Sequence, residues 1–108
     1  MSLSLFTKGE RKMLERDFQR KLIQKLHKQY PDCLVLKNDP NYMQGIPDLI
    51  ILYKDKWAAL ECKRSEAASK RCNQEVYVDK MGKMSFARFI FPENEKEVLD
   101  DLSKLFQS

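Results

Sequence analysis

The sequence predicts a single α/β domain, and three observations support this class. Helix-length and strand-length patterns alternate along the chain, and no internal repeat or Pro/Gly-rich linker interrupts them. A chain of 108 residues is long enough for one hydrophobic core but too short for two. The unbroken apolar run from Leu49 to Tyr53 is typical of a strand covered on both faces, at the centre of a sheet. We therefore expect residues 1–108 to form one domain with one functional site.

The first predicted element is a helix from about Gly9 to Tyr30. Thr7 and Glu10 have the spacing of a capping box, in which two side chains satisfy backbone N–H groups that the helix start leaves unbonded. Pro31 ends this helix. The apolar stripe that we expect to face the core consists of Leu14, Phe18, Leu22 and Leu26.

Strands and a hairpin follow the first helix. Residues from Cys33 to Lys37 predict a strand, and the turn-forming residues of segment 38–45 predict a loop. The tight polar turn at 54–56 predicts that Trp57 to Lys63 returns antiparallel to the central strand.

The last third of the chain predicts a helix, a strand and a second helix. The helix extends from about Lys70 to Met81 and is closed by Gly82, a residue that tolerates the left-handed dihedrals common after a helix end. The strand covers Ser85 to Phe91, and Asn94 caps the last helix. The inward residues of that helix are Val98, Leu99, Leu102, Leu105 and Phe106. The predicted order is α-β-β-β-α-β-α.

Three polar residues are expected to meet at one end of the sheet. Side chains alternate along a strand, so Glu61 and Lys63 project from one side and Cys62 from the other. If the two central strands form a hairpin, Asp48 at the start of the first lies across from Glu61 at the end of the second. Two carboxylates and an ammonium would then share one site.

This combination suits metal-assisted phosphodiester hydrolysis. Mg²⁺ typically takes one or two carboxylates, here Asp48 and Glu61, with waters and substrate phosphate as its other ligands. The metal lowers the pKa of a bound water, and Lys63 can orient that water or stabilise the charge of the transition state. A structural alternative exists, because Pro-Asp often begins a strand and Glu-x-Lys often lies on an exposed strand face.

Two helices each break their apolar stripe with a polar residue. Glu15 projects between Leu22 and Leu26, and a carboxylate that faces a core needs a partner or a metal. It therefore faces the site, or forms a salt bridge with Lys63. Gln74 begins the inward stripe of the second helix, where it can bond catalytic residues or a phosphate, or serve as a structural amide.

Charge is unevenly distributed along the chain. Residues 1–91 hold 18 Lys and Arg against 11 Asp and Glu, a net +7, whereas residues 92–108 hold 2 against 5, a net −3. A basic body suits a polyanionic partner. Lys70 and Arg71 at the start of the second helix, together with Arg64, are expected to contact the DNA backbone, although a solvated helix end has the same composition.

Cysteine content and hydropathy exclude several classes of protein. Cys33, Cys62 and Cys72 are an odd number without a CxxC pair, which argues against a disulfide framework and favours buried free thiols. A zinc site that includes His27 is the alternative. No secretory signal or membrane-span pattern is present, so we expect a cytoplasmic protein.

Taken in order, these residues resemble a known family. Gly45-Ile46-Pro47-Asp48, then Glu61-Cys62-Lys63, then Gln74, with Glu15 and Gln19 on an opening helix, look like the PD-(D/E)XK nucleases. More narrowly they resemble the small VRR-NUC group, which is found in phages and as a domain of larger repair nucleases.

The resemblance implies a restriction-endonuclease-like αβββαβ core with a central mixed β-sheet flanked by helices. It implies that Asp48, Glu61 and the backbone carbonyl of Cys62 hold Mg²⁺, for which Mn²⁺ would substitute. Lys63 would be catalytic, with Glu15 and Gln74 supporting the site. It also implies a homodimer that cleaves branched DNA such as Holliday junctions.

Two other functions remain open at this point. The chain could be a nucleic-acid-binding module that keeps the fold without catalysis. It could also be a protein-interaction subunit that uses the acidic last helix, residues 95–108, as its contact surface, although a solvated helix face has the same composition.

Overall fold

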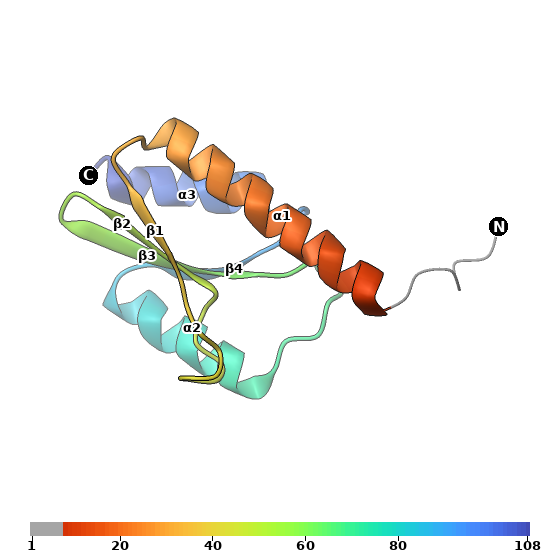
Figure 1. Cartoon of the computed structure of the whole chain (residues 1–108). Helices are drawn as coiled ribbons and strands as arrows, with labels where there is room; N and C mark the ends of the chain where they lie inside the picture. Colours follow the sequence, from red (N-terminus) through yellow and green to blue (C-terminus); the bar gives the residue numbers. More distant parts are fainter. Residues whose placement is uncertain (1–7) are drawn as a thin grey trace.

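A four-stranded mixed sheet separates two helical layers (Figure 1). The computed structural model describes the backbone of residues 8–108 and the side chains from Leu14 onward. The elements are α1 (Lys8–Gln29), β1 (Leu34–Lys37), β2 (Leu49–Tyr53), β3 (Lys56–Cys62), α2 (Cys72–Met84), β4 (Ala87–Ile90) and α3 (Glu95–Phe106). This order confirms the α/β class and the predicted succession of elements.

The strands lie in the order β1-β2-β3-β4. β1 pairs with β2, and β2 with β3, in antiparallel orientation. β3 pairs with β4 in parallel, and α2 forms the crossover between them. A turn at Lys54 and Asp55 joins β2 to β3, and Lys54 adopts a φ of 57° there. The resulting register places Leu49 opposite Leu60, so Asp48 lies next to Glu61.

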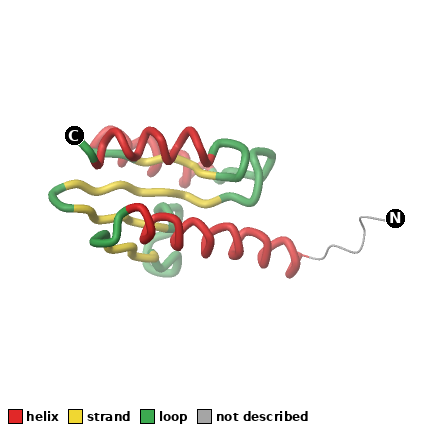
Figure 2. Tube along the Cα trace, turned by 90° about the horizontal axis from the view of Figure 1, so that it is seen from above, coloured by secondary structure: helices red, strands yellow, loops and turns green. Residues whose placement is uncertain are grey.

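The hydrophobic core lies between the sheet and the layer formed by α1 and α3. The two helices run in the same direction across one face of the sheet (Figures 1 and 2), and an edge-on contact between Tyr30 and Phe106, 5.1 Å between ring centroids, joins their C-terminal ends. Alternation along the strands directs every second residue into this core. Its fully buried members include Leu22, Leu26, Leu49, Ile51, Leu60, Ile90, Val98 and Leu102.

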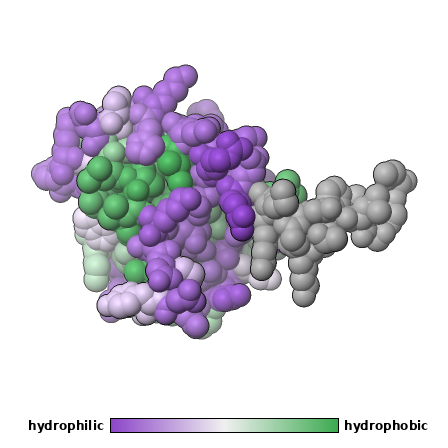
Figure 3. Space-filling view, in the orientation of Figure 1, coloured by the Kyte–Doolittle hydropathy of each residue, from purple (hydrophilic) through white to green (hydrophobic). Residues whose placement is uncertain are grey.

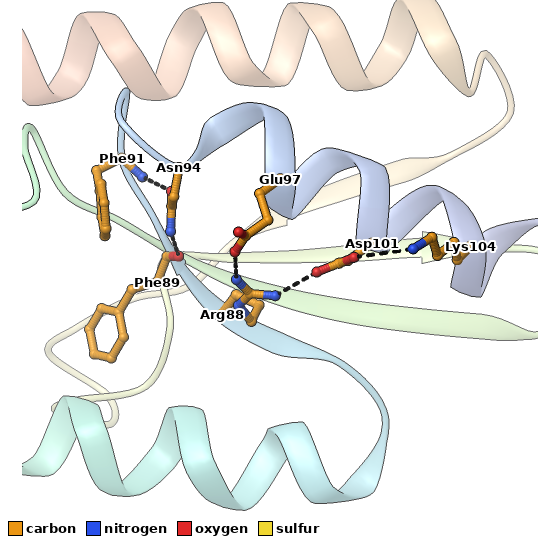
Figure 4. Close-up of polar contacts among 7 residues, drawn as sticks. All are labelled: Arg88, Phe89, Phe91, Asn94, Glu97, Asp101 and Lys104. Carbon is orange, nitrogen blue, oxygen red and sulfur yellow. Dashed lines mark hydrogen bonds and ion pairs between the residues drawn. The ribbon is translucent and has the colours of Figure 1, made fainter.

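Polar contacts attach α3 to β4 (Figure 4). The Arg88 guanidinium donates to Asp101 at 3.0 Å and to Glu97 at 2.9 Å. Asn94 stands at the N-cap position, as predicted, but its amide points back to the strand: Oδ1 accepts from the Phe91 N–H and Nδ2 donates to the Phe89 carbonyl. The chain therefore turns directly from β4 into α3.

The opposite face of the sheet is covered more thinly. Helix α2 packs on β3 and β4, and none of its residues is buried. Beyond it, Leu34 and Leu36 of β1 are 59% and 47% exposed, and Figure 3 shows apolar side chains gathered over β1 and β2. The prediction that β2 is covered on both faces was therefore wrong. Leu49 and Ile51 are buried, whereas the residues that alternate with them are half-buried.

Two local predictions were wrong for identifiable reasons. Leu14 is 56% exposed because the N-terminal half of α1 extends beyond the sheet (Figure 2), so this turn has no core to face. Gly82 does not end α2, which continues to Met84. Among the described glycines only Gly45 has a positive φ, so Gly82 does not take the left-handed dihedrals of a helix end, and a Cβ there would make only an ordinary contact of 3.5 Å with the carbonyl oxygen of Ala87. The expected cap at Thr7 lies outside the described residues.

Tyr30 supplies a test of this core. Its hydroxyl oxygen is the one buried side-chain polar atom among the described residues that lacks a hydrogen-bond partner. A buried unsatisfied group costs roughly 1–3 kcal/mol, so Tyr30→Phe is expected to raise the free energy of unfolding by about 1 kcal/mol in urea denaturation. Tyr53→Phe, in the half-buried ring that contacts Tyr30, is the control and should change little. A destabilised Tyr30→Phe would show that the hydroxyl is bonded.

Candidate active site

Two reciprocal hydrogen bonds join Asp48 to the end of β3. The Asp48 N–H donates to Oε1 of Glu61 at 3.1 Å, and Oδ2 of Asp48 accepts from the Cys62 N–H at 2.9 Å. The hairpin register produces this arrangement, because it sets the start of β2 beside the end of β3. Each carboxylate is thereby held by a backbone donor, and both keep acceptor capacity.

Lys63 and Gln74 complete one side of the site. Lys63 Nζ donates to Oε1 of Gln74 at 2.8 Å and lies 3.8 Å from Oε2 of Glu61, while Nε2 of Gln74 donates to the same Glu61 oxygen at 3.0 Å. Oε1 of Gln74 also accepts from the Arg71 N–H at the start of α2. Gln74 is thus bonded at both ends of its amide, and it orients an ammonium and a carboxylate at once.

Glu15 approaches from the other helical layer. It lines an open cavity of about 310 Å³ together with Arg16, Gln19 and Asp48. Lys63 bonds Gln74 and Glu61, so the alternative pairing of Glu15 with Lys63 is not what the structure shows. Hydrogen bonds and an ion pair thus join Asp48, Glu61, Lys63 and Gln74 at one end of the sheet, whereas Glu15 is near them only through the cavity that it shares with Asp48.

Burial makes the ionised forms of the carboxyl groups in this cluster less favourable. Glu61 is 3% exposed, and burial followed by repulsion from Asp48 raises the pKa of Glu61 to about 8, although Lys63 opposes the shift. Burial also raises the pKa of Asp48 above its ordinary value, against the hydrogen bond from the Cys62 N–H. Glu15 adds further negative charge near both carboxyls. The single positive charge of Lys63 is therefore not enough to offset the negative charge of the ionised carboxylates.

These residues fit a divalent cation. Glu15, Asp48 and Glu61 carry three negative charges when ionised and Lys63 one positive charge, which leaves −2. No three His, Cys, Asp or Glu side chains converge as a ready-made metal centre in residues 14–108. Mg²⁺ does not need such a cage, because one or two carboxylates with waters and substrate oxygens complete its octahedron. Asp48, Glu61 and the Cys62 carbonyl are the groups that would hold it.

The predicted DNA-contacting residues have different environments. Arg64 and Arg71 are exposed. Lys70 Nζ lies 5.4 Å from the ring centroid of Phe89 and 5.6 Å from that of Phe91, so two aromatic faces hold its ammonium in place. Arg16 was missed by the sequence analysis, because an arginine on a helix surface has no periodic signal that distinguishes it from a solvated residue.

The thiols give no second site. Cys33 and Cys62 are buried, as predicted, whereas Cys72 is exposed at the start of α2, contrary to the prediction. His27 Nδ1 lies 3.8 Å from Sγ of Cys33, and within the part of the chain that the structure describes this pair belongs to no group of three His, Cys, Asp or Glu side chains that could hold a metal. Burial raises the pKa of Cys62, whose side chain shares the α1 side with Gln19.

Comparison with known proteins adds no assignment: no family model, curated protein or solved structure matches this chain. Across residues 8–108, none of the helices has the length and apolar character needed to cross a membrane.

The raised pKa of Glu61 predicts a specific pH dependence of stability. A carboxyl whose folded pKa lies near 8 instead of 4.5 binds more protons when folded, so its contribution to stability is full below about pH 4.5 and is lost as the pH rises through 8. Urea denaturation of metal-free protein between pH 5 and 9 is expected to show this fall. Glu61→Gln should flatten it, with Glu75→Gln on the exposed side of α2 as control. An identical slope in Glu61→Gln would contradict the assignment.

Proposed function

We propose that this chain is a Mg²⁺-dependent endonuclease that hydrolyses DNA phosphodiester bonds. The observation that carries the proposal is the pair of carboxylates of half-buried Asp48 and buried Glu61, each held by a backbone N–H donor and accompanied by the buried Lys63 ammonium. A structural ion pair would neutralise its charges, whereas this cluster retains an excess of negative charge that a cation would offset. Such a site is costly to fold and is understandable as a functional one.

Each residue has a definable part in that reaction. A bound Mg²⁺ would supply an activated water and screen the charge of the attacked phosphate. Lys63 would donate to that water or to a phosphate oxygen, and Gln74 would hold the ammonium in position. Glu15, which shares a cavity with Asp48, would accept a hydrogen bond from a water near the metal.

The arrangement of elements supports the finer fold assignment. The order α1-β1-β2-β3-α2-β4, with two antiparallel contacts followed by one parallel contact, is what we expect of a restriction-endonuclease-like core. By this resemblance we propose that the protein is a PD-(D/E)XK nuclease of the VRR-NUC type. Fold likeness alone does not define activity, so the site carries the functional argument.

Cleavage assays test the proposal. Asp48→Asn keeps the shape of the side chain but removes its charge, and Lys63→Ala removes the ammonium. Each is expected to lower the cleavage rate by a factor on the order of 10²–10³ in Mg²⁺ or Mn²⁺. Asp55→Asn and Lys80→Ala are the matched controls, because both residues are exposed away from the site.

The substrates would be a panel of linear and branched DNAs, with EDTA as the metal-free condition. Full activity in both site variants would rule this site out. Salt-sensitive binding without cleavage in any divalent metal would instead establish the non-catalytic binding module.

A homodimer is part of the proposal. β1 is an edge strand of the sheet, and two of its leucines, Leu34 and Leu36, are exposed. Proteins usually cover or charge such an edge, and a second copy of the chain can cover it by a two-fold symmetric contact.

Light scattering tests this contact. The wild-type protein is expected to have the mass of two chains, and Leu36→Lys the mass of one, because a charge would be desolvated in the interface. Met84→Lys is the control, since Met84 is 64% exposed at the other end of the thin layer. A monomeric wild-type protein at micromolar concentration would contradict the dimer.

A further inference from the structure

The loop between β1 and β2 presents an isolated aromatic side chain to solvent. Tyr42 is 88% exposed, the highest value among the large hydrophobic side chains of the described residues. A tyrosine offers both faces of its ring for stacking and loses little conformational freedom when it does so. The chain itself buries neither face, so a partner molecule has full access to the ring.

Hydrogen bonds close the base of this loop. The Asn38 N–H donates to the Asp48 carbonyl at 2.8 Å, and Nδ2 of Asn38 donates to the Pro47 carbonyl at 2.6 Å. Because these bonds end on Asp48 and its neighbour, the base of the loop is part of the same strand end that holds the candidate active site. A ligand seated on the loop is thereby placed relative to that site.

The tip of the loop is also ordered. Oδ1 of Asp39 accepts from the Asn41 N–H at 2.8 Å, and the Asp39 carbonyl accepts from the Tyr42 N–H at 3.1 Å. Together these bonds form a compact turn in which the polar side chain satisfies the backbone. Tyr42 therefore stands on a supported turn, and its exposure is a consequence of that turn.

Gly45 brings the returning arm of the loop against α2. Its φ is +88°, and a Cβ at this position would lie 2.7 Å from Cγ of Asn73 in the first turn of the helix. Only glycine accommodates both the dihedral and the close approach without displacement. Figure 1 shows the loop beside α2, at whose start Lys70 and Arg71 stand. The returning arm of the loop and the first turn of α2 are thus neighbours.

The distance along the chain limits where a stacked ligand can lie. Tyr42 lies six positions before Asp48, and a fully extended chain of that length spans at most about 22 Å. A stacked nucleic acid strand rises about 3.4 Å per nucleotide, so this limit corresponds to about six nucleotides. A nucleic acid strand bound at the candidate active site beside Asp48 can therefore also reach Tyr42.

We propose that Tyr42 is a stacking site for an unpaired nucleobase of the DNA that the candidate active site cleaves. The inference rests on the proposed nuclease function and specifies its substrate. Within a continuous duplex both faces of each base are covered by neighbouring pairs, whereas flaps and branch points expose base faces that stack on aromatic side chains. Tyr42 would thus favour branched or partly single-stranded DNA over linear duplex.

Binding measurements test the stacking site directly. Fluorescence anisotropy in EDTA compares a linear duplex, the same duplex with a single-stranded flap, and a four-way junction with unpaired bases at its centre. Stacking contributes roughly 1–3 kcal/mol per base, so Tyr42→Ala is expected to weaken binding of the flapped and branched DNAs about 5- to 150-fold and to leave the linear duplex unchanged.

Two variants serve as controls in the same assay. Tyr42→Phe keeps the ring and is expected to bind as the wild type does, which separates stacking from a hydrogen bond of the hydroxyl. Met84→Ala removes another exposed apolar side chain, 64% exposed at the far end of α2, and should change nothing. Quenching of 2-aminopurine at the unpaired position should be lost in Tyr42→Ala and kept in Tyr42→Phe.

The outcomes separate this inference from the proposed function. Unchanged binding of the branched DNAs by Tyr42→Ala, or an equal loss on all three DNAs, would overturn the stacking site while leaving nuclease activity in Mg²⁺ intact. A wild-type protein that cleaves nothing would overturn the proposed function. The anisotropy and quenching measurements, made without metal, would still decide whether Tyr42 binds an unpaired base.

Discussion

The reciprocal bonding between Asp48 and the end of β3 is the constraint on which the rest of the site depends. One backbone N–H of each strand holds the carboxylate of the other, so two groups that repel when ionised are fixed side by side. Only a hairpin register that places the start of β2 opposite the end of β3 permits this exchange. A shift of one residue would direct Glu61 into the hydrophobic core.

The two faces of the sheet are covered to different extents. Between the sheet and α1 with α3 lies a continuous core, which gives the strands a rigid support. On the other face α2 has no buried residue, yet its Gln74 bonds Lys63 and Glu61. The α2 layer covers the sheet more thinly, whereas the α1 and α3 layer forms the hydrophobic core that supports the strands. The site lies where the two layers end.

Several elements could be predicted because their causes are local. The apolar run of β2, the Lys54-Asp55 turn and the periodic stripe of α3 each depend on neighbours in sequence, and all three are present. Gly82 was misread because the chain does not take left-handed dihedrals there and α2 continues to Met84, and the exposure of Leu14 depends on where the sheet ends. Neither feature changes the periodicity of its helix, so the sequence pattern could not predict it. The polar break at Gln74 was informative because a polar residue in an apolar stripe needs a distant partner, and its amide bonds Lys63 and Glu61.

The sequence by itself determined the α/β class, the order of the elements and the polar residues that required partners, since alternation and helical periodicity state which side chains share a face. The tertiary structure alone decided how those partners bond: the Asp48 N–H donates to Glu61 while the Cys62 N–H donates to Asp48, the Gln74 amide bonds two groups, and the pKa of Glu61 is raised. Hydrogen-bond geometry and burial arise from elements far apart in sequence. A pattern within one element can therefore indicate that a polar residue needs a partner, but the partner and the distance follow only from the packed chain.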